Sequence, residues 1–167
     1  KAAMVLALSR PELVNRLIVA DIAPVAYGHS QIQYIDAMRR VDLSQVEKRS
    51  DAAELLAPLV DNPALVPFFL QSLDVRNKRW ILNLDVLAKE MPEILGFPEV
   101  SGMYPGKALF LAGADSDYIK RDDRPKIKAL FPEAQSFKIP GAGHWLHAEQ
   151  PRAFEASLRV FFDYGAL

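Results

Sequence analysis

Three short stretches of strand-like hydrophobicity, spaced by helical patterns, do most to limit what this 167-residue chain can fold into. The run Leu17–Ala20 is apolar throughout, which is typical of a strand covered on both faces, as in a parallel sheet. Strand character returns at Lys107–Ala112, after a Pro105-Gly106 turn, and again at Gln135–Ile139. Helical patterns precede the first strand, separate the strands and follow the last one. This alternation predicts an α/β fold with a parallel sheet and right-handed crossovers.

A long helical insert interrupts the alternation between residues 25 and 103, where helix–turn–helix signals recur without a convincing strand. Helix starts are indicated by Ser30, by Ser50–Glu54 and by Asn62-Pro63. We therefore expect residues 1–24 and 104–167 to form the α/β core, and residues 25–103 to form a helical cap. The insert is rich in Phe, Leu and Met, which suits a cap over an apolar pocket, although such a stripe is more often plain hydrophobic core.

The composition excludes several classes of protein and site. Half of the residues (50%) are hydrophobic, 25% are charged and the net charge is −1, so the chain lacks the basic surplus of a nucleic-acid binder. No apolar run approaches the roughly 18 residues of a membrane span. The absence of cysteine excludes disulfides, thiolate metal sites and a cysteine nucleophile. We expect neither a nucleic acid nor a membrane as partner, and the composition favours a cytoplasmic location.

The loop Gly141–Trp145 presents a histidine just after the last predicted strand. Glycines on both sides of Ala142 allow a tight turn and leave room beside the imidazole of His144. A base that moves a proton between a nucleophile and a leaving group needs such a placement. The same pattern also fits a loop histidine with no chemical role. Glu149 and Pro151, which follow, are interpreted as residues of a helix start.

Two aspartates follow predicted strands and are candidate partners for this histidine. Asp21 comes directly after Leu17–Ala20, and Asp115 lies in the polar loop Gly113–Asp117 after the second strand. The carboxyl ends of parallel strands meet at the edge where open α/β sheets place their sites. Either aspartate could instead cap a turn or a helix.

Taken together, these segments resemble the carboxyl-terminal part of an α/β-hydrolase. The matching segments are Leu17–Pro24, Leu109–Gly113 and Gly141–Pro151. Within that superfamily the chain resembles small bacterial esterases related to mitochondrial abhydrolase-domain proteins. The resemblance implies the carboxyl-terminal half of an α/β-hydrolase parallel sheet, with a helical cap inserted after the strand that ends at Asp21.

The resemblance also implies a Ser-His-Asp triad, in which His144 shuttles the proton and an aspartate orients its imidazole. Most of the superfamily keeps the acid at the position of Asp115. The particular relatives match the Asp-Ile-Ala-Pro context of Asp21 and often carry a non-acidic residue at the other position. Because both positions are aspartates in this chain, the sequence leaves the acid open and favours Asp21.

The opening residues Lys1–Met4 resemble the helix that follows the nucleophile elbow of the family, so the catalytic serine is expected upstream of Lys1. Ser9, Ser30 and Ser116 lack the Gly-x-Ser-x-Gly surroundings of that elbow. We therefore expect a complementary amino-terminal segment of the same protein to supply the nucleophile. The chain alone is expected to be inactive.

The function implied by the resemblance is hydrolysis of small to medium acyl esters or thioesters, without a cofactor. Alternatives on the same fold are a non-catalytic ligand-binding or interaction protein, an epoxide hydrolase, a dehalogenase and a haloperoxidase. His144 and His147 have a spacing that can supply two metal ligands, but no third ligand stands in the required relation, so no metal is expected. His147 is interpreted as a packing residue near the last helix.

Overall fold

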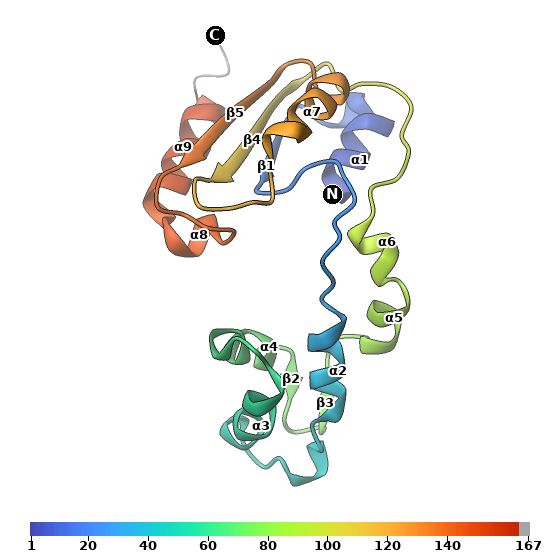
Figure 1. Cartoon of the computed structure of the whole chain (residues 1–167), viewed down its shortest axis with the longest axis vertical. Coiled ribbons are helices and arrows are strands. Elements are labelled where there is room, and N and C mark those ends of the chain that lie inside the picture. Colours follow the sequence, from blue (N-terminus) through green and yellow to red (C-terminus); the bar gives the residue numbers. More distant parts are fainter. Residues whose placement is uncertain (164–167) are drawn as a thin grey trace. The chain divides into compact units, whose positions relative to one another are not determined.

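The computed structural model describes residues 1–163 and divides them into two compact units. The sheet unit consists of Lys1–Val25 and the described residues from Phe97 onward, and the helical unit of Ala26–Gly96 (Figure 1). The sequence suggests a second boundary between residues 103 and 104, seven residues later. Residues 97–103 belong to the sheet unit because Phe97 and Val100 pack against its core.

The sheet unit contains the predicted parallel sheet. Its strands are β1 (Arg16–Ala20), β4 (Lys107–Gly113) and β5 (Ala134–Ile139), in the order β1-β4-β5. Arg16 pairs with Lys107 at the start of β1, and both strand pairs are parallel. The α/β class with a parallel sheet is thereby confirmed. β4 is buried along nearly its whole length, as expected for a central strand covered on both faces.

Helices cover both faces of this sheet (Figure 1). They are α1 (Ala2–Ser9), α7 (Arg124–Leu130), α8 (Leu146–Glu149) and α9 (Pro151–Asp163). Side chains alternate along a strand, so Phe110 of β4 packs with α1 and α7, whereas Leu109 and Leu111 pack with α8 and α9. Two apolar clusters therefore lie on opposite sides of one central strand.

The end of α9 is tied to the first strand. The guanidinium of Arg16 donates hydrogen bonds to the carbonyls of Phe161 and Phe162, at 2.9 and 2.6 Å. The last carbonyls of a helix have no partner within the helix, and a cation is favourable beside them. This contact fixes the helix that follows the histidine loop against the sheet.

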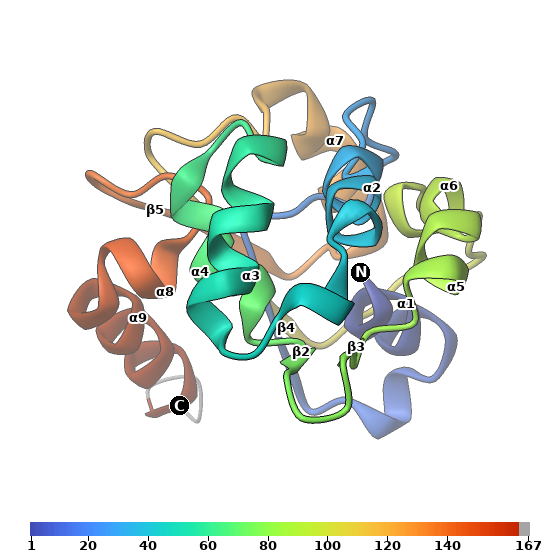
Figure 2. The ribbon, with the colours of Figure 1, turned by 90° about the horizontal axis from the view of Figure 1, so that it is seen from below.

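The helical unit, whose helices Figure 2 shows, has a hydrophobic core of its own. Its helices are α2 (Ile32–Arg40), α3 (Arg49–Leu56), α4 (Val66–Leu70), α5 (Leu84–Lys89) and α6 (Met91–Leu95). Of the predicted helix starts, Asn62 accepts a hydrogen bond from the Ala64 N–H, and the Ser30 hydroxyl accepts one from the Ile32 N–H. The helix start predicted at Ser50–Glu54 lies one residue earlier, at Arg49, the first residue of α3.

The expectation that this segment contains no strand is wrong. Leu73–Asp74 (β2) and Arg79–Trp80 (β3) pair as a short antiparallel hairpin. The turn is held by the Asp74 carboxylate, which accepts hydrogen bonds from the backbone and side-chain amides of Asn77. Strands of two residues are too short to show a periodic pattern, which is why the sequence does not reveal them.

Membrane-spanning character is not found in the described chain: within residues 1–163 no helix combines the length and the apolar character that a span requires.

Candidate active site

Asp21 stands at the end of β1 as a buried carboxylate. Only 1% of its surface is exposed, and within residues 1–163 it is the one buried polar or charged residue. Its φ is +47°, and its N–H donates to the Leu111 carbonyl at 2.8 Å, so the backbone turns while still bonded to β4. An aspartate tolerates this left-handed conformation better than most residues. The Gly113 N–H donates to its Oδ1 at 3.1 Å.

The second carboxylate oxygen of Asp21 lies against the histidine. His144 Nδ1 and Asp21 Oδ2 are 2.8 Å apart, and 39% of the His144 side chain is exposed. An ionised carboxylate only accepts hydrogen bonds, so Nδ1 carries the proton in this contact. The neutral imidazole then keeps Nε2 as a proton acceptor, which is the state that a general base requires.

Ser116 and Tyr118 complete the surroundings of this pair. The Ser116 hydroxyl donates to Asp21 Oδ2 and accepts the Tyr118 N–H at 3.2 Å. The Tyr118 ring stacks on the His144 ring, with centroids 3.6 Å apart and an interplanar angle of 14°. Burial, together with the charges of Asp117 and Asp21, raises the pKa of the Tyr118 phenol, so this ring stays neutral beside the pair.

Sequence reasoning missed both of these residues. From the sequence, Ser116 is only a serine without the surroundings of a nucleophile elbow, and no pattern points to Tyr118. The available signal was their position: a Ser-x-Tyr segment follows the strand next to the one that ends at Asp21. Loops after neighbouring parallel strands meet at one edge of the sheet.

Asp115, the other candidate acid, is exposed. Its backbone N–H donates to the Ala142 carbonyl at 3.0 Å, so the residue joins its loop to the histidine loop through the main chain. The two loops touch so closely that a Cβ on Gly113 would overlap the carbonyl oxygens of Ala142 and Gly143. Glycine is required at this position for steric reasons.

The histidine loop is held by the short helix that follows it. Gly141 turns the chain with a φ of +66°, and its carbonyl accepts a hydrogen bond from Gln150 Nε2 at 3.2 Å. The sequence predicts that Glu149 and Pro151 both lie at a helix start. Pro151 does begin α9, but Glu149 is the last residue of α8. The Glu149 carboxylate folds back to accept the N–H groups of Gly143 and Trp145.

Known proteins resemble this chain over nearly its whole length. The sn-1-specific diacylglycerol lipase ABHD11 of Danio rerio is 40% identical, over 98% of this chain and 54% of the relative. Esterase YbfF of Escherichia coli (strain K12) is 31% identical, over 98% of this chain and 63% of the relative. A solved marine microorganism esterase superposes with a TM-score of 0.86 at 37% identity, covering 95% of this chain and 65% of that one. The chain has the fold of the carboxyl-terminal part of an α/β-hydrolase.

The chain spans about half the length of the curated relatives that it matches, for example 54% of the lipase from Danio rerio. No protein-family model matches it. More distant structures show the fold alone, such as E-2-(acetamidomethylene)succinate hydrolase, with a TM-score of 0.59 at 17% identity.

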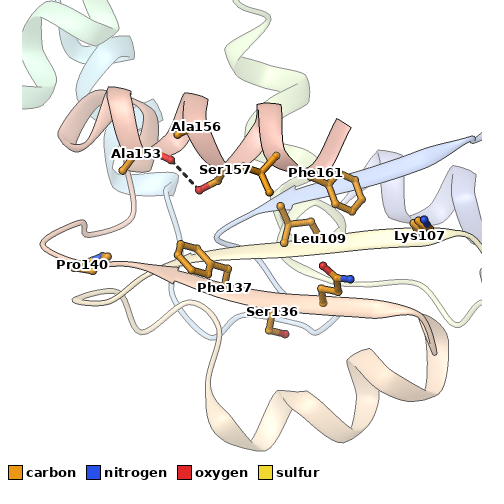
Figure 3. Close-up of a pocket in the computed structure, with 11 residues that line it drawn as sticks. Lys107, Leu109, Ser136, Phe137, Pro140, Ala153, Ala156, Ser157 and Phe161 are labelled. Carbon is orange, nitrogen blue, oxygen red and sulfur yellow. Dashed lines mark hydrogen bonds between the residues drawn. The ribbon is translucent and has the colours of Figure 1, made fainter. Parts of the chain in front are cut away.

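A cavity of about 690 Å³ lies between β4, β5 and α9 (Figure 3). Leu109, Phe137 and Phe161 supply much of its apolar wall. Small residues on α9 leave the space open; one of them, Ser157, donates its hydroxyl to the Ala153 carbonyl. Neither Asp21 nor His144 lines this cavity, so the cavity is separate from the His144–Asp21 pair.

No group of three His, Cys, Asp or Glu side chains that could hold a metal ion occurs in the part of the chain that the structure describes. The ring of His147 makes an edge contact with Phe154, with centroids 6.1 Å apart. His147 therefore contacts the last helix.

Proposed function

We propose that the protein containing this chain is a serine hydrolase that cleaves small to medium acyl esters or thioesters. The observation that carries the proposal is the His144–Asp21 pair, with Nδ1 and Oδ2 2.8 Å apart and the imidazole partly exposed. Relatives named as a lipase and as esterases support ester hydrolysis as the reaction class.

In the proposed reaction the two ring nitrogens of His144 have different roles. A serine supplied by a segment outside this sequence attacks the acyl carbon and gives its proton to Nε2 of His144. Asp21 holds the opposite side of the ring and stabilises the imidazolium that forms. His144 then protonates the leaving alcohol or thiol, and water repeats the cycle on the acyl-enzyme. The segment outside this sequence also supplies the N–H groups of the oxyanion hole.

Asp21, and not Asp115, is the proposed acid. Asp21 is buried and shares its oxygens among Gly113, Ser116 and His144, so its position is fixed before substrate arrives. Ser116 is not proposed as nucleophile because its hydroxyl donates to Asp21. A preorganised acid of this kind keeps the imidazole in the tautomer that the reaction requires.

The helical unit is proposed to act as a cap. It is inserted between β1 and β4, and it has its own hydrophobic core. Caps on hydrolases exclude water and enclose the acyl group, which strengthens the electrostatic interactions of the site.

The test is labelling of the complete, folded protein with a fluorophosphonate probe. We expect stoichiometric labelling of a serine, loss of labelling in His144→Ala, and wild-type labelling in Asp115→Asn. A folded protein without adduct, or an adduct that His144→Ala leaves unchanged, would favour a non-catalytic binding protein. An aspartate at the nucleophile position would instead indicate an epoxide hydrolase or a dehalogenase.

A second measurement concerns residues 1–167 by themselves. We expect no turnover of p-nitrophenyl acetate by this chain. Turnover that is lost in His144→Ala would show that the nucleophile lies within the chain and would overturn that part of the proposal.

A further inference from the structure

We propose that Glu149 is a positioning residue for the general base: its carboxylate fixes the backbone on which His144 stands, so that Nδ1 reaches Asp21. The inference rests on the proposed function for its catalytic consequence. Its geometric part, the placement of the imidazole, does not depend on any activity.

The geometry is a carboxylate that bridges the backbone around one residue. The Gly143 N–H donates to Oε2 at 2.6 Å and the Trp145 N–H donates to Oε1 at 3.1 Å. One of these N–H groups precedes His144 in the chain and the other follows it. Hydrogen bonds to an ionised carboxylate are stronger than those between neutral groups. The two oxygens together therefore restrict the rotation of the main chain that carries the imidazole.

The loop needs such a restraint because its sequence is permissive. Gly141 and Gly143 have no side chains to limit their backbone angles. A Cβ on Gly143 would lie 3.1 Å from Glu149 Oε2, so the carboxylate occupies the space that a side chain would use. The imidazole is held by Asp21 and by the Tyr118 ring, and Glu149 holds the backbone behind it.

A purely structural role for Glu149 gives a different expectation. Gln150 anchors Gly141 through a separate hydrogen bond, and Leu146 of α8 is buried in the core. These contacts hold the loop to the sheet unit without Glu149. Replacing Glu149 should therefore loosen the placement of His144 while the fold remains, whereas a merely structural residue would change stability and leave the imidazole of the folded protein unchanged.

The test compares Glu149→Gln with Glu155→Gln in the complete protein. Glutamine has one carbonyl oxygen, so it accepts one N–H and turns its NH₂ group toward the other. Glu155 is an exposed carboxylate on α9 that pairs with Arg159, so its replacement removes the same charge without touching the loop. With p-nitrophenyl butyrate, we expect kcat of Glu149→Gln to fall by roughly 10- to 100-fold and KM to stay within about twofold. Glu155→Gln should behave as wild type.

The second readout is the proton NMR signal of His144 Nδ1, assigned by its loss in Asp21→Asn. We expect this signal to shift or broaden in Glu149→Gln and to stay unchanged in Glu155→Gln. An unchanged signal, or a wild-type kcat in an active enzyme, would overturn the inference. If the wild-type protein has no hydrolase activity, the proposed function fails, and the NMR signal alone still decides whether Glu149 places the imidazole.

Discussion

The two units of the chain use the same residue type, aspartate, in opposite ways. In the sheet unit, Asp21 is buried at the end of a strand, and its carboxylate accepts hydrogen bonds from Gly113, Ser116 and His144. One of these three partners is an imidazole, whose two ring nitrogens can donate and accept a proton. The Asp21 carboxylate therefore holds the imidazole of His144 through a hydrogen bond to Nδ1.

In the helical unit, three aspartates hold turns and helix starts, and none of them is buried. Asp42 accepts from Ser44 and Gln45, Asp51 from the N–H groups of Glu47 and Lys48, and Asp74 from Asn77. These hydrogen bonds lower the pKa of all three carboxyls. Asp21 therefore differs from these three aspartates in its burial and in its histidine partner, and not in residue type.

The largest expected effect sharpens this comparison directly. Asp21→Asn in the complete enzyme should lower kcat by on the order of 10³–10⁴, because the imidazole loses the acceptor that fixes its tautomer. Asp42→Asn should leave kcat within about twofold, since this carboxylate only holds a turn. Ester hydrolysis at saturating substrate is the measurement. Comparable losses in both variants would break the distinction.

The next largest effect is a difference in stability between alanine variants of two glycines, one in each unit. Gly113→Ala should destabilise the sheet unit by about 1–3 kcal/mol and lower kcat, because the new Cβ would push the histidine loop away. Gly28→Ala in the helical unit should change stability by less than about 0.5 kcal/mol, since no atom lies within 4 Å of the position of its Cβ. Urea unfolding of both variants checks this; a silent Gly113→Ala would contradict the close approach of the loops.

Ser116→Ala should have a smaller effect on catalysis. It removes one hydrogen bond to Asp21 and leaves the bonds from Gly113 and His144. A hydrogen bond to a charged group is worth about 1.5–3 kcal/mol, and about 1.4 kcal/mol is a factor of ten in rate, so kcat should fall by roughly 10- to 100-fold. Ser157→Ala is the matched control, because its hydroxyl donates to the Ala153 carbonyl within α9. Equal kcat values for the two variants would remove Ser116 from the site.

The smallest effect is a difference in acid stability between the units. A carboxyl whose pKa is lowered on folding stabilises the fold above its ordinary pKa of 3.8, and this stabilisation is lost as the pH falls through the lowered value. The helical unit should therefore lose stability below about pH 4. Changing Asp42, Asp51 and Asp74 to Asn together should flatten this dependence.

Each unit carries one tryptophan, Trp80 in the helical unit and Trp145 in the sheet unit, so fluorescence can follow them separately. Trp145→Phe isolates the signal of Trp80 for urea titrations between pH 2 and 6. An acid transition that the triple Asn variant leaves unchanged would show that these three carboxyls do not carry the effect.

The sequence was sufficient for the sheet because its strands are long enough to show their pattern. The runs at Leu17–Ala20 and Lys107–Ala112 became β1 and β4, and the alternation at Gln135–Ile139 became β5. The hairpin of β2 and β3 was missed because each strand has only two residues.

The candidate site was only partly accessible from the sequence. Asp21 and Asp115 both follow strands, and their sequence positions do not show which carboxylate reaches His144. The answer depends on the backbone at each strand end, and the φ of +47° at Asp21 is a property of the folded chain. The stacking of Tyr118 and the reach of Glu149 depend in the same way on loop conformations that no periodicity encodes.

The N–H of Asp21 bonds to Leu111, so the acid of the pair is also the last rung of the β1–β4 ladder. A slip of β1 by one residue would bring Ala20 or Ile22 to this rung and would turn the carboxylate to the other face of the sheet. A misaligned folding intermediate therefore cannot carry an assembled acid–base pair. The contact between His144 and Asp21 should accordingly report correct strand alignment during refolding, whatever the rest of the protein does.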